Sequence, residues 1–139
     1  MRRVVLLLLL VAAPGLTACD GGEKKADLPF APVREAMDKD AQAFAAYFQT
    51  VKGQPVNWTG RVTEVLRQRG DDYVEEAHLF VDMDPPGQGK EAADVTFQIP
   101  VSAVQKLQVG QPVNYVAVIR EFERTDSAVV LKLELKKLN

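Results

Sequence analysis

Beyond Gly53 the chain alternates hydrophobic and polar positions with a period of two, which is the pattern of strands that bury one face. In the first such stretch Val56, Trp58, Gly60 and Val62 alternate with polar side chains. Turn-forming residues separate this stretch from four more, of which three alternate in the same way and one, residues 112–122, is rich in Val, Ile and Tyr. The pattern therefore predicts five strands, over residues 56–62, 73–82, 94–99, 112–122 and 129–136.

A short helical turn is predicted between the third and fourth strands. Pro100 ends the third strand, Val101, Val104 and Leu107 follow at helical spacing, and Gly110 closes the turn. The strand region thus reads as three strands, a short helix and two strands.

The segment before the strands has a helical period instead. Its apolar side chains recur every three or four residues and form one stripe, made of Val33, Met37, Ala41, Phe44, Phe48 and Val51. Gly53 and Pro55 end the pattern, so one amphipathic helix is expected over residues 32–53. A membrane-surface or partner-binding helix is the alternative, but its polar face has no excess of positive charge. We therefore expect the stripe to pack against the strands.

The first 18 residues have the three-part layout of an export signal. A short basic start, Met1-Arg2-Arg3, precedes an apolar run over residues 4–13 that is too short to span a bilayer. Small and apolar residues lead from there to Cys19, the only cysteine of the chain, so no disulfide within one chain can form. Residues 1–18 are expected to be removed, and the polar residues 19–31 to form a flexible tether.

The four residues Leu16, Thr17, Ala18 and Cys19 resemble the lipobox of bacterial lipoproteins. The resemblance implies cleavage after Ala18 and a diacylglyceryl (palmitate-type) anchor on Cys19, which would hold the protein to a membrane facing the periplasm. An ordinary signal peptide with an incidental cysteine is the alternative. Asp20, directly after the cysteine, resembles the signal that retains some lipoproteins in the inner membrane.

Residues 54–139 resemble an OB-fold domain, a five-stranded Greek-key barrel with a short helix between strands 3 and 4. The predicted element order is that of the fold, and Gly60 stands where the first strand must bend. The stretch 107–113, Leu-Gln-Val-Gly-Gln-Pro-Val, resembles the L-x-x-G-x-x-V entry to the fourth strand. The resemblance is to the tRNA-anticodon-like group, which also occurs in bacterial envelope lipoproteins, and it implies a mainly β domain.

OB-fold domains bind oligomers on the outer face of strands 2 and 3, between the loops that join strands 1–2 and 4–5. Here those loops are residues 68–72 and 124–127. The side chains expected to point outward are His78, Phe80, Asp82, Thr96 and Gln98. This set holds one aromatic side chain and no lysine or arginine, whereas binders of single-stranded nucleic acid need stacked aromatics and a basic groove.

The charge balance also argues against nucleic acid as a partner. Of 17 basic side chains, Arg2 and Arg3 lie in the signal, so 15 oppose 19 acidic ones in the mature chain. A local anion site would still form if the strand arginines converged: Arg61, Arg67, Arg69, Arg120 and Arg124. Acidic neighbours are expected to neutralise them. The residues retained as candidate ligand contacts are Trp58, Arg61, Arg69, Phe80 and Arg124, although Trp58 also suits a core position.

No set of residues points to catalysis. His78 is the only histidine and has no partner at a recognisable spacing, Ser102 and Ser127 lie in no nucleophile motif, and lipid would occupy Cys19. The stretch 82–84, Asp-Met-Asp, has too few oxygen ligands for a calcium loop, so incidental turn carboxylates are expected there. The chain is expected to be neither an enzyme nor the holder of a metal or cofactor.

These observations favour a lipid-anchored, non-enzymatic module of the cell envelope that contacts another envelope protein. The alternative is an OB-fold domain that binds an oligosaccharide, a peptide or an anionic polymer. The fold hosts both kinds of function, so only the geometry of a site distinguishes them.

Overall fold

The computed structural model describes residues 28–69, 75–89 and 91–139. Two α-helices come first, α1 (Phe30–Met37) and α2 (Ala41–Val51). The strands are β1 (Pro55–Arg69), β2 (Glu75–Asp82), β3 (Val95–Ile99), β4 (Pro112–Arg124) and β5 (Val129–Leu138), and a 3₁₀-helix, η1 (Val101–Lys106), joins β3 to β4. The predicted mainly β class and the predicted order of the strands and the short helix are confirmed. The signal, the lipobox, Asp20 and part of the first strand loop lie outside the described residues.

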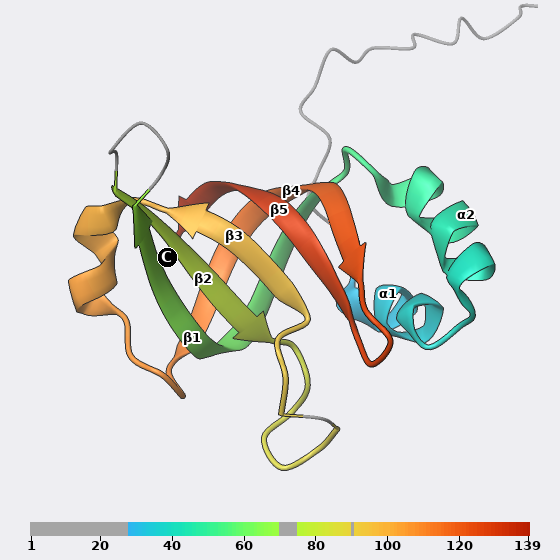
Figure 1. The fold of residues 1–139 in the computed structure, drawn as a ribbon, viewed down its shortest axis with the longest axis horizontal. Helices are drawn as coiled ribbons and strands as arrows, with labels where there is room; N and C mark the ends of the chain where they lie inside the picture. The colour runs from blue at the N-terminus through green and yellow to red at the C-terminus, as the bar shows by residue number, and fades with distance from the viewer. Residues whose placement is uncertain (1–27, 70–74, 90) are drawn as a thin grey trace, which may run out of the picture.

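The five strands form one sheet that closes on itself in the order β1-β2-β3-β5-β4 (Figure 1). Neighbouring strands are antiparallel except β3 and β5, which are parallel. Strand β1 closes the ring because its first half pairs with β4 and its second half with β2, the change falling at Arg61. The strand is longer than its alternation predicts, since pairing with β2 continues to Arg69.

The core fills the inside of this closed sheet. The alternate apolar residues of all five strands are buried, among them Leu79, Phe97, Tyr115, Ile119 and Leu131. The period-two pattern thus identified the buried faces of β1, β2, β3 and β5, as expected when a sheet covers its own core.

Gly60 is required by the close packing of β1 against β2. A Cβ at this position would contact the side chain of Val81 and would lie 2.9 Å from the carbonyl oxygen of Asp82. The irregular register of β1 against β2 comes later, between Val62 and Glu64. Gly60 therefore lets β1 and β2 approach closely beside the point where β1 changes partners.

The single helix predicted over residues 32–53 is wrong, because the chain breaks into α1 and α2. The side chain of Asp40 accepts a hydrogen bond from the backbone N–H of Ala43 at 2.9 Å and so begins a second helix. The break turns Ala41 out to solvent, while Phe44 and Phe48 remain buried. The predicted packing of the apolar side chains is confirmed, but by two short helices.

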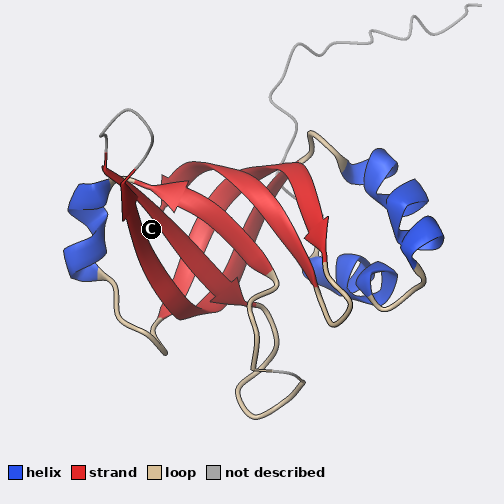
Figure 2. Cartoon of the chain, viewed as in Figure 1, coloured by secondary structure: helices blue, strands red, loops and turns tan. Residues whose placement is uncertain are grey.

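The helices lie at opposite ends of the sheet, α1 and α2 at one end and η1 at the other (Figure 2). Leu28 and Phe30, which fall within the predicted tether of residues 19–31, pack against the core instead. No helix of the described part is long and apolar enough to cross a bilayer.

Candidate functional site

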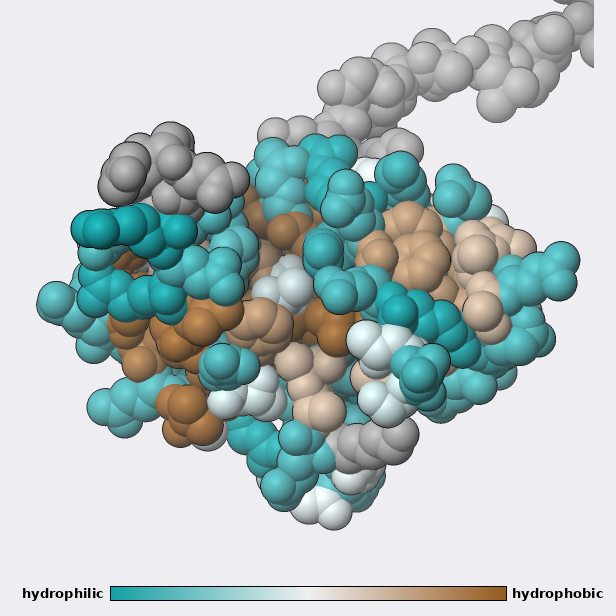
Figure 3. Space-filling view, viewed as in Figure 1, coloured by the Kyte–Doolittle hydropathy of each residue, from teal (hydrophilic) through white to brown (hydrophobic). Residues whose placement is uncertain are grey.

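A groove crosses the outer face of the sheet where the sequence predicts a binding surface. We call it the face groove. Its volume is about 610 Å³, and residues from all five strands and from the β4–β5 turn line it: Leu66, Gln68, His78, Phe80, Thr96, Phe97, Gln98, Arg120, Glu121, Glu123, Thr125, Val130, Lys132 and Leu133. In Figure 3 this side of the molecule, with β2, β3 and β5 toward the viewer, shows apolar patches bordered by hydrophilic side chains.

Strand alternation places the side chains of this groove. Leu79 and Val81 of β2 point into the core, so His78 and Phe80 line the groove on the other face, as Thr96 and Gln98 of β3 also do. These four positions agree with the prediction. Phe80 of β2 is half-buried and offers an aromatic surface in the groove.

Asp82 does not face solvent as predicted, since its side chain is fully buried. Arg61 reaches across from β1 and donates to its carboxylate at 3.0 Å. The backbone N–H of Asp84 donates to its second oxygen at 2.9 Å. A carboxylate with two such donors is satisfied away from water.

The basic side chains that line the face groove have acidic partners. Arg120 binds Glu134 with an N···O distance of 2.6 Å, and Lys132 lies 3.3 Å from Glu123. The imidazole of His78 lies 3.6 Å from the carboxylate of Glu76. The groove is therefore polar at its border but presents little net charge to a ligand.

Trp58 does not line this groove. Its side chain is 4% exposed, and its indole N–H donates to the carbonyl oxygen of Leu28 at 2.7 Å. The ring of Phe30 packs edge-on against it, with 5.0 Å between ring centres. Trp58 is a core anchor for the segment that enters α1, which was one of the two interpretations of the sequence.

The predicted arginines do not converge on one anion site. Arg61 and Arg69 lie eight residues apart along β1, about 26 Å at the rise of an extended strand. Arg61 is held by Asp82, and Arg124, on β4, donates to the carbonyl oxygen of Lys39 between α1 and α2 at 3.2 Å. Of the five candidate ligand residues, only Phe80 lines the face groove.

Three aspartates gather instead at the end of the sheet that α1 covers. Carboxylate oxygens of Asp82, Asp84 and Asp94 all lie within 4.8 Å of one another. Arg34 of α1 pairs with Asp94 at 2.6 Å and with Asp84 at 2.8 Å. These are not the incidental turn carboxylates that the sequence suggests, because Arg34 and Arg61 bind them and tie α1 to the loop between β2 and β3.

Burial dominates the electrostatics of this aspartate cluster. Desolvation raises the pKa of the Asp94 carboxyl above its ordinary value, although the hydrogen bonds from Arg34 and from the backbone N–H of Met83 lower it in part. Burial also raises the pKa of the Tyr115 phenol, whose hydroxyl contacts the sulfur of Met83 at 3.1 Å. The cluster is therefore a largely buried network whose carboxylates are paired with Arg34 and Arg61.

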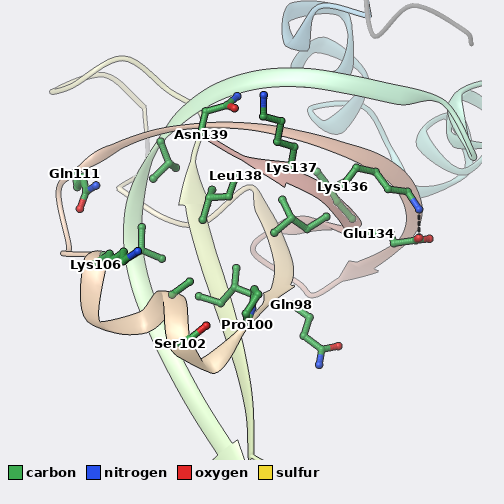
Figure 4. Close-up of a pocket in the computed structure, with 16 residues that line it drawn as sticks. Gln98, Pro100, Ser102, Lys106, Gln111, Glu134, Lys136, Lys137, Leu138 and Asn139 are labelled. Atoms are coloured by element: carbon green, nitrogen blue, oxygen red, sulfur yellow. Dashed lines mark hydrogen bonds and ion pairs between the residues drawn. The ribbon is translucent and has the colours of Figure 1, made fainter.

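A second and larger cleft lies between η1 and the last residues of β5, and the sequence did not indicate it. We call it the end cleft. Its volume is about 930 Å³, and it is lined by Gln98, Ile99, Pro100, Ser102, Ala103, Lys106, Leu107, Gln111, Val113, Leu133, Glu134, Leu135, Lys136, Lys137, Leu138 and Asn139 (Figure 4). The one feature of the sequence that bears on this cleft is that the fifth predicted strand, residues 129–136, is longer than the third, residues 94–99, so part of it lacks a neighbour on that side.

The walls of the end cleft combine apolar side chains with lysines. Leu107, Leu135 and Leu138 are half-buried along it, and Lys106, Lys136 and Lys137 are exposed at its border. Gln98 and Leu133 line both this cleft and the face groove, so the two hollows adjoin where β3 and β5 separate.

Comparison with known proteins yields a likeness of fold. No protein-family model and no curated protein matches the sequence. One solved structure has a TM-score of 0.50 and 15% sequence identity, covering 79% of this chain and all of the other. It is a protein of Klebsiella pneumoniae subsp. pneumoniae that is named, provisionally, a nucleic acid-binding lipoprotein. The likeness supports the arrangement of strands.

Proposed function

We propose that this chain is a bacterial lipoprotein, held to a membrane by lipid on Cys19 and facing the periplasm, whose OB-type barrel binds a polypeptide segment of another envelope protein in the face groove. The lipobox Leu16-Thr17-Ala18-Cys19 supports the anchor. The provisional lipoprotein name of the Klebsiella protein, which shares the fold, agrees with it. Asp20 favours the inner membrane.

The observation that carries the binding proposal is the composition of the face groove. It lies on the outer face of β2 and β3, beside the β4–β5 turn, where OB-fold domains bind their ligands. Its floor is apolar around Phe80, while Arg120 and Lys132 are already paired with glutamates. Little net charge and an aromatic anchor suit a polypeptide, because anchors of this kind dominate protein interfaces.

Nucleic acid fits this groove less well. Sequence-independent binding to a phosphate backbone needs cations that are free to replace counterions, and stacking on bases needs several exposed aromatics. Among the described residues that line the groove, Phe80 and the buried Phe97 are the aromatics, and both basic side chains have acidic partners. Nucleic acid binding therefore belongs only to the provisional name of the Klebsiella protein and is no part of the proposal for this chain.

Photo-crosslinking in intact membranes tests the binding proposal. A crosslinking amino acid at Thr125, which lines the groove from the β4–β5 turn, is expected to join the chain to one envelope protein. F80D in the same chain should reduce that adduct about tenfold, because loss of a central anchor typically costs more than about 1 kcal/mol. The matched control carries the crosslinker at Gln49, an exposed residue of α2, and should not form the adduct.

Two results would contradict the binding proposal. One is an adduct at Thr125 that F80D leaves unchanged. The other is a ligand that is a glycan or a nucleic acid and whose binding perturbs His78, Phe80 and Gln98, which would favour the alternative function. The anchor is tested separately, because C19S should abolish incorporation of labelled palmitate whatever the groove binds.

A further inference from the structure

The second half of β5 has an open edge. The pairing of β5 with β3 ends at Phe97 and Leu133, yet β5 continues along β4, with one register shift at Lys136, until Tyr115 faces Leu138. On the other side β3 stops at Ile99, and Pro100 directs the chain into η1. Within the described part of the chain, residues 134–138 therefore have a strand neighbour on the β4 side only.

An open edge is a binding feature because its outward N–H and C=O groups have no partner in the sheet. Five residues of extended chain span about 17 Å, enough for a short added strand. Such edges bind extended peptides by main-chain hydrogen bonds, and pockets for alternate side chains supply the selectivity. The end cleft runs along this edge, so an added strand would have space beside β5 (Figure 4).

The cleft supplies the pockets that such a peptide needs. Ile99 and Val113 are buried in its wall, and Leu107, Leu135 and Leu138 are half-buried. Since η1 itself has no buried residue, it covers this end of the core incompletely. Alternate apolar side chains of an added strand would cover the leucines and remove apolar surface from water.

Lysines at the border of the end cleft favour a ligand with negative charge. Lys136 is paired with Glu134, whereas Lys106 and Lys137 have no ion-pair partner among the described residues. Two unpaired cations beside an open strand edge stand out on a chain with more acidic than basic side chains. Acidic side chains on an incoming strand would complement them.

We propose that the end cleft binds an extended polypeptide segment of alternating acidic and apolar residues, which adds as a strand to residues 134–138 of β5. The lysines of β5 disfavour a second copy of this chain, because pairing two β5 edges would bring Lys136 and Lys137 of each near their counterparts. Lysines at an edge protect against self-association in this way. The inference does not depend on the face groove.

The test uses the full chain in detergent and a synthetic eight-residue peptide of alternating valine and glutamate, blocked at both ends. Hydrogen–deuterium exchange should show slower exchange of amides over residues 134–138 when the peptide is present. The double variant K106E/K137E should weaken binding about tenfold, as reversal of two border charges predicts. The control K52E alters an exposed lysine after α2 and should leave binding unchanged.

Two control peptides separate strand addition from simple charge attraction. A valine–lysine peptide should not bind, and a valine–glutamate peptide with N-methyl groups on alternate residues should lose binding at least about tenfold, because its backbone donors are blocked. The proposal is overturned by equal binding of the N-methylated peptide, by absence of binding, or by protection outside β5. It is also overturned if the chain alone forms a dimer whose residues 134–138 are protected, since a second copy would then be the occupant.

Discussion

The two ends of the closed sheet differ in how completely helices cover the core. At the sealed end, formed by α1, α2 and the strand residues they cover, Phe44 and Phe48 pack edge-on against Phe122 with ring centres 4.9 and 4.8 Å apart. At the open end, formed by η1 and residues 134–138 of β5, the covering helix buries its apolar side chains only in part and leaves a cleft. The sealed end therefore carries stability, and the open end is available for binding.

The charged groups at the two ends also differ, since the aspartate cluster at the sealed end is largely buried and the charged side chains at the open end are exposed. At the sealed end Asp94 is 7% exposed and is bound by Arg34, so desolvation governs its protonation. At the open end Glu134 is exposed, and Lys136 and Arg120 hold its pKa below the ordinary value. Buried charges need fixed partners, whereas exposed ones remain free to exchange them for a ligand. This difference is a physical reason to look for partners at the open end.

The largest expected effect distinguishes the two ends by packing. F44A removes a ring that is 1% exposed and should lower the free energy of unfolding by about 3–5 kcal/mol. L107A, its counterpart at the open end, removes a half-buried side chain and should cost about 1 kcal/mol. Urea unfolding measures both. Equal losses would show that the open end is packed as tightly as the sealed one.

An intermediate loss of unfolding free energy is expected when a side chain is added at Gly60, beside the aspartate cluster. G60A would place a Cβ against Val81 and 2.8 Å from the sulfur of Met83, so the β2 backbone must move. Overpacking of this kind should cost about 1–3 kcal/mol of unfolding free energy, whereas T59S, which keeps the hydroxyl that accepts a hydrogen bond from Asn114 at the exposed neighbouring position, should change it by less than about 0.5 kcal/mol. Thermal or urea unfolding of both variants decides the matter, and a neutral G60A would mean that β1 and β2 separate easily.

The smallest effect is a difference in the direction of pH dependence. The folded-state pKa of Asp94 is raised, so its contribution to stability is greatest below its ordinary pKa and is lost as pH rises through the raised pKa. Glu134 has a lowered pKa, so its contribution is present above the ordinary pKa and is lost as pH falls through the lowered pKa. The two carboxylates should therefore respond oppositely to pH.

Unfolding of D94N and E134Q between about pH 3 and pH 7 measures this difference against the parent chain. The stability deficit of D94N should shrink as pH rises, while that of E134Q should grow. NMR titration of the two carboxyl groups in the parent provides an independent measure of the same pKa directions. If the stability deficits of D94N and E134Q changed in the same direction with pH, the two carboxylates would not differ as proposed.

Local pattern was sufficient for the elements and for their buried faces. Alternation identified four of the strands and the inward positions of β2 and β3, since each strand must turn every second side chain to the core, and richness in Val, Ile and Tyr identified β4. The OB-fold resemblance directed attention to the face of β2 and β3, and alternation gave its outward side chains His78, Phe80, Thr96 and Gln98, which line the face groove. Local pattern misjudged the helices, because the cap formed by Asp40 divides a stripe whose spacing alone looks continuous.

What the sequence by itself determined are those features that neighbouring residues decide: the strand order along the chain, the apolar face of each element, and the lipobox at Cys19 as a motif. Only the tertiary structure decided that the carbonyl of Leu28 accepts a hydrogen bond from Trp58 and that Asp82 binds Arg61. It also decided that β5 extends beyond its pairing with β3 and leaves an open edge. These depend on which distant segments meet when the sheet closes. Periodicity records which face of a segment is buried, but it carries no information about the segment that buries it.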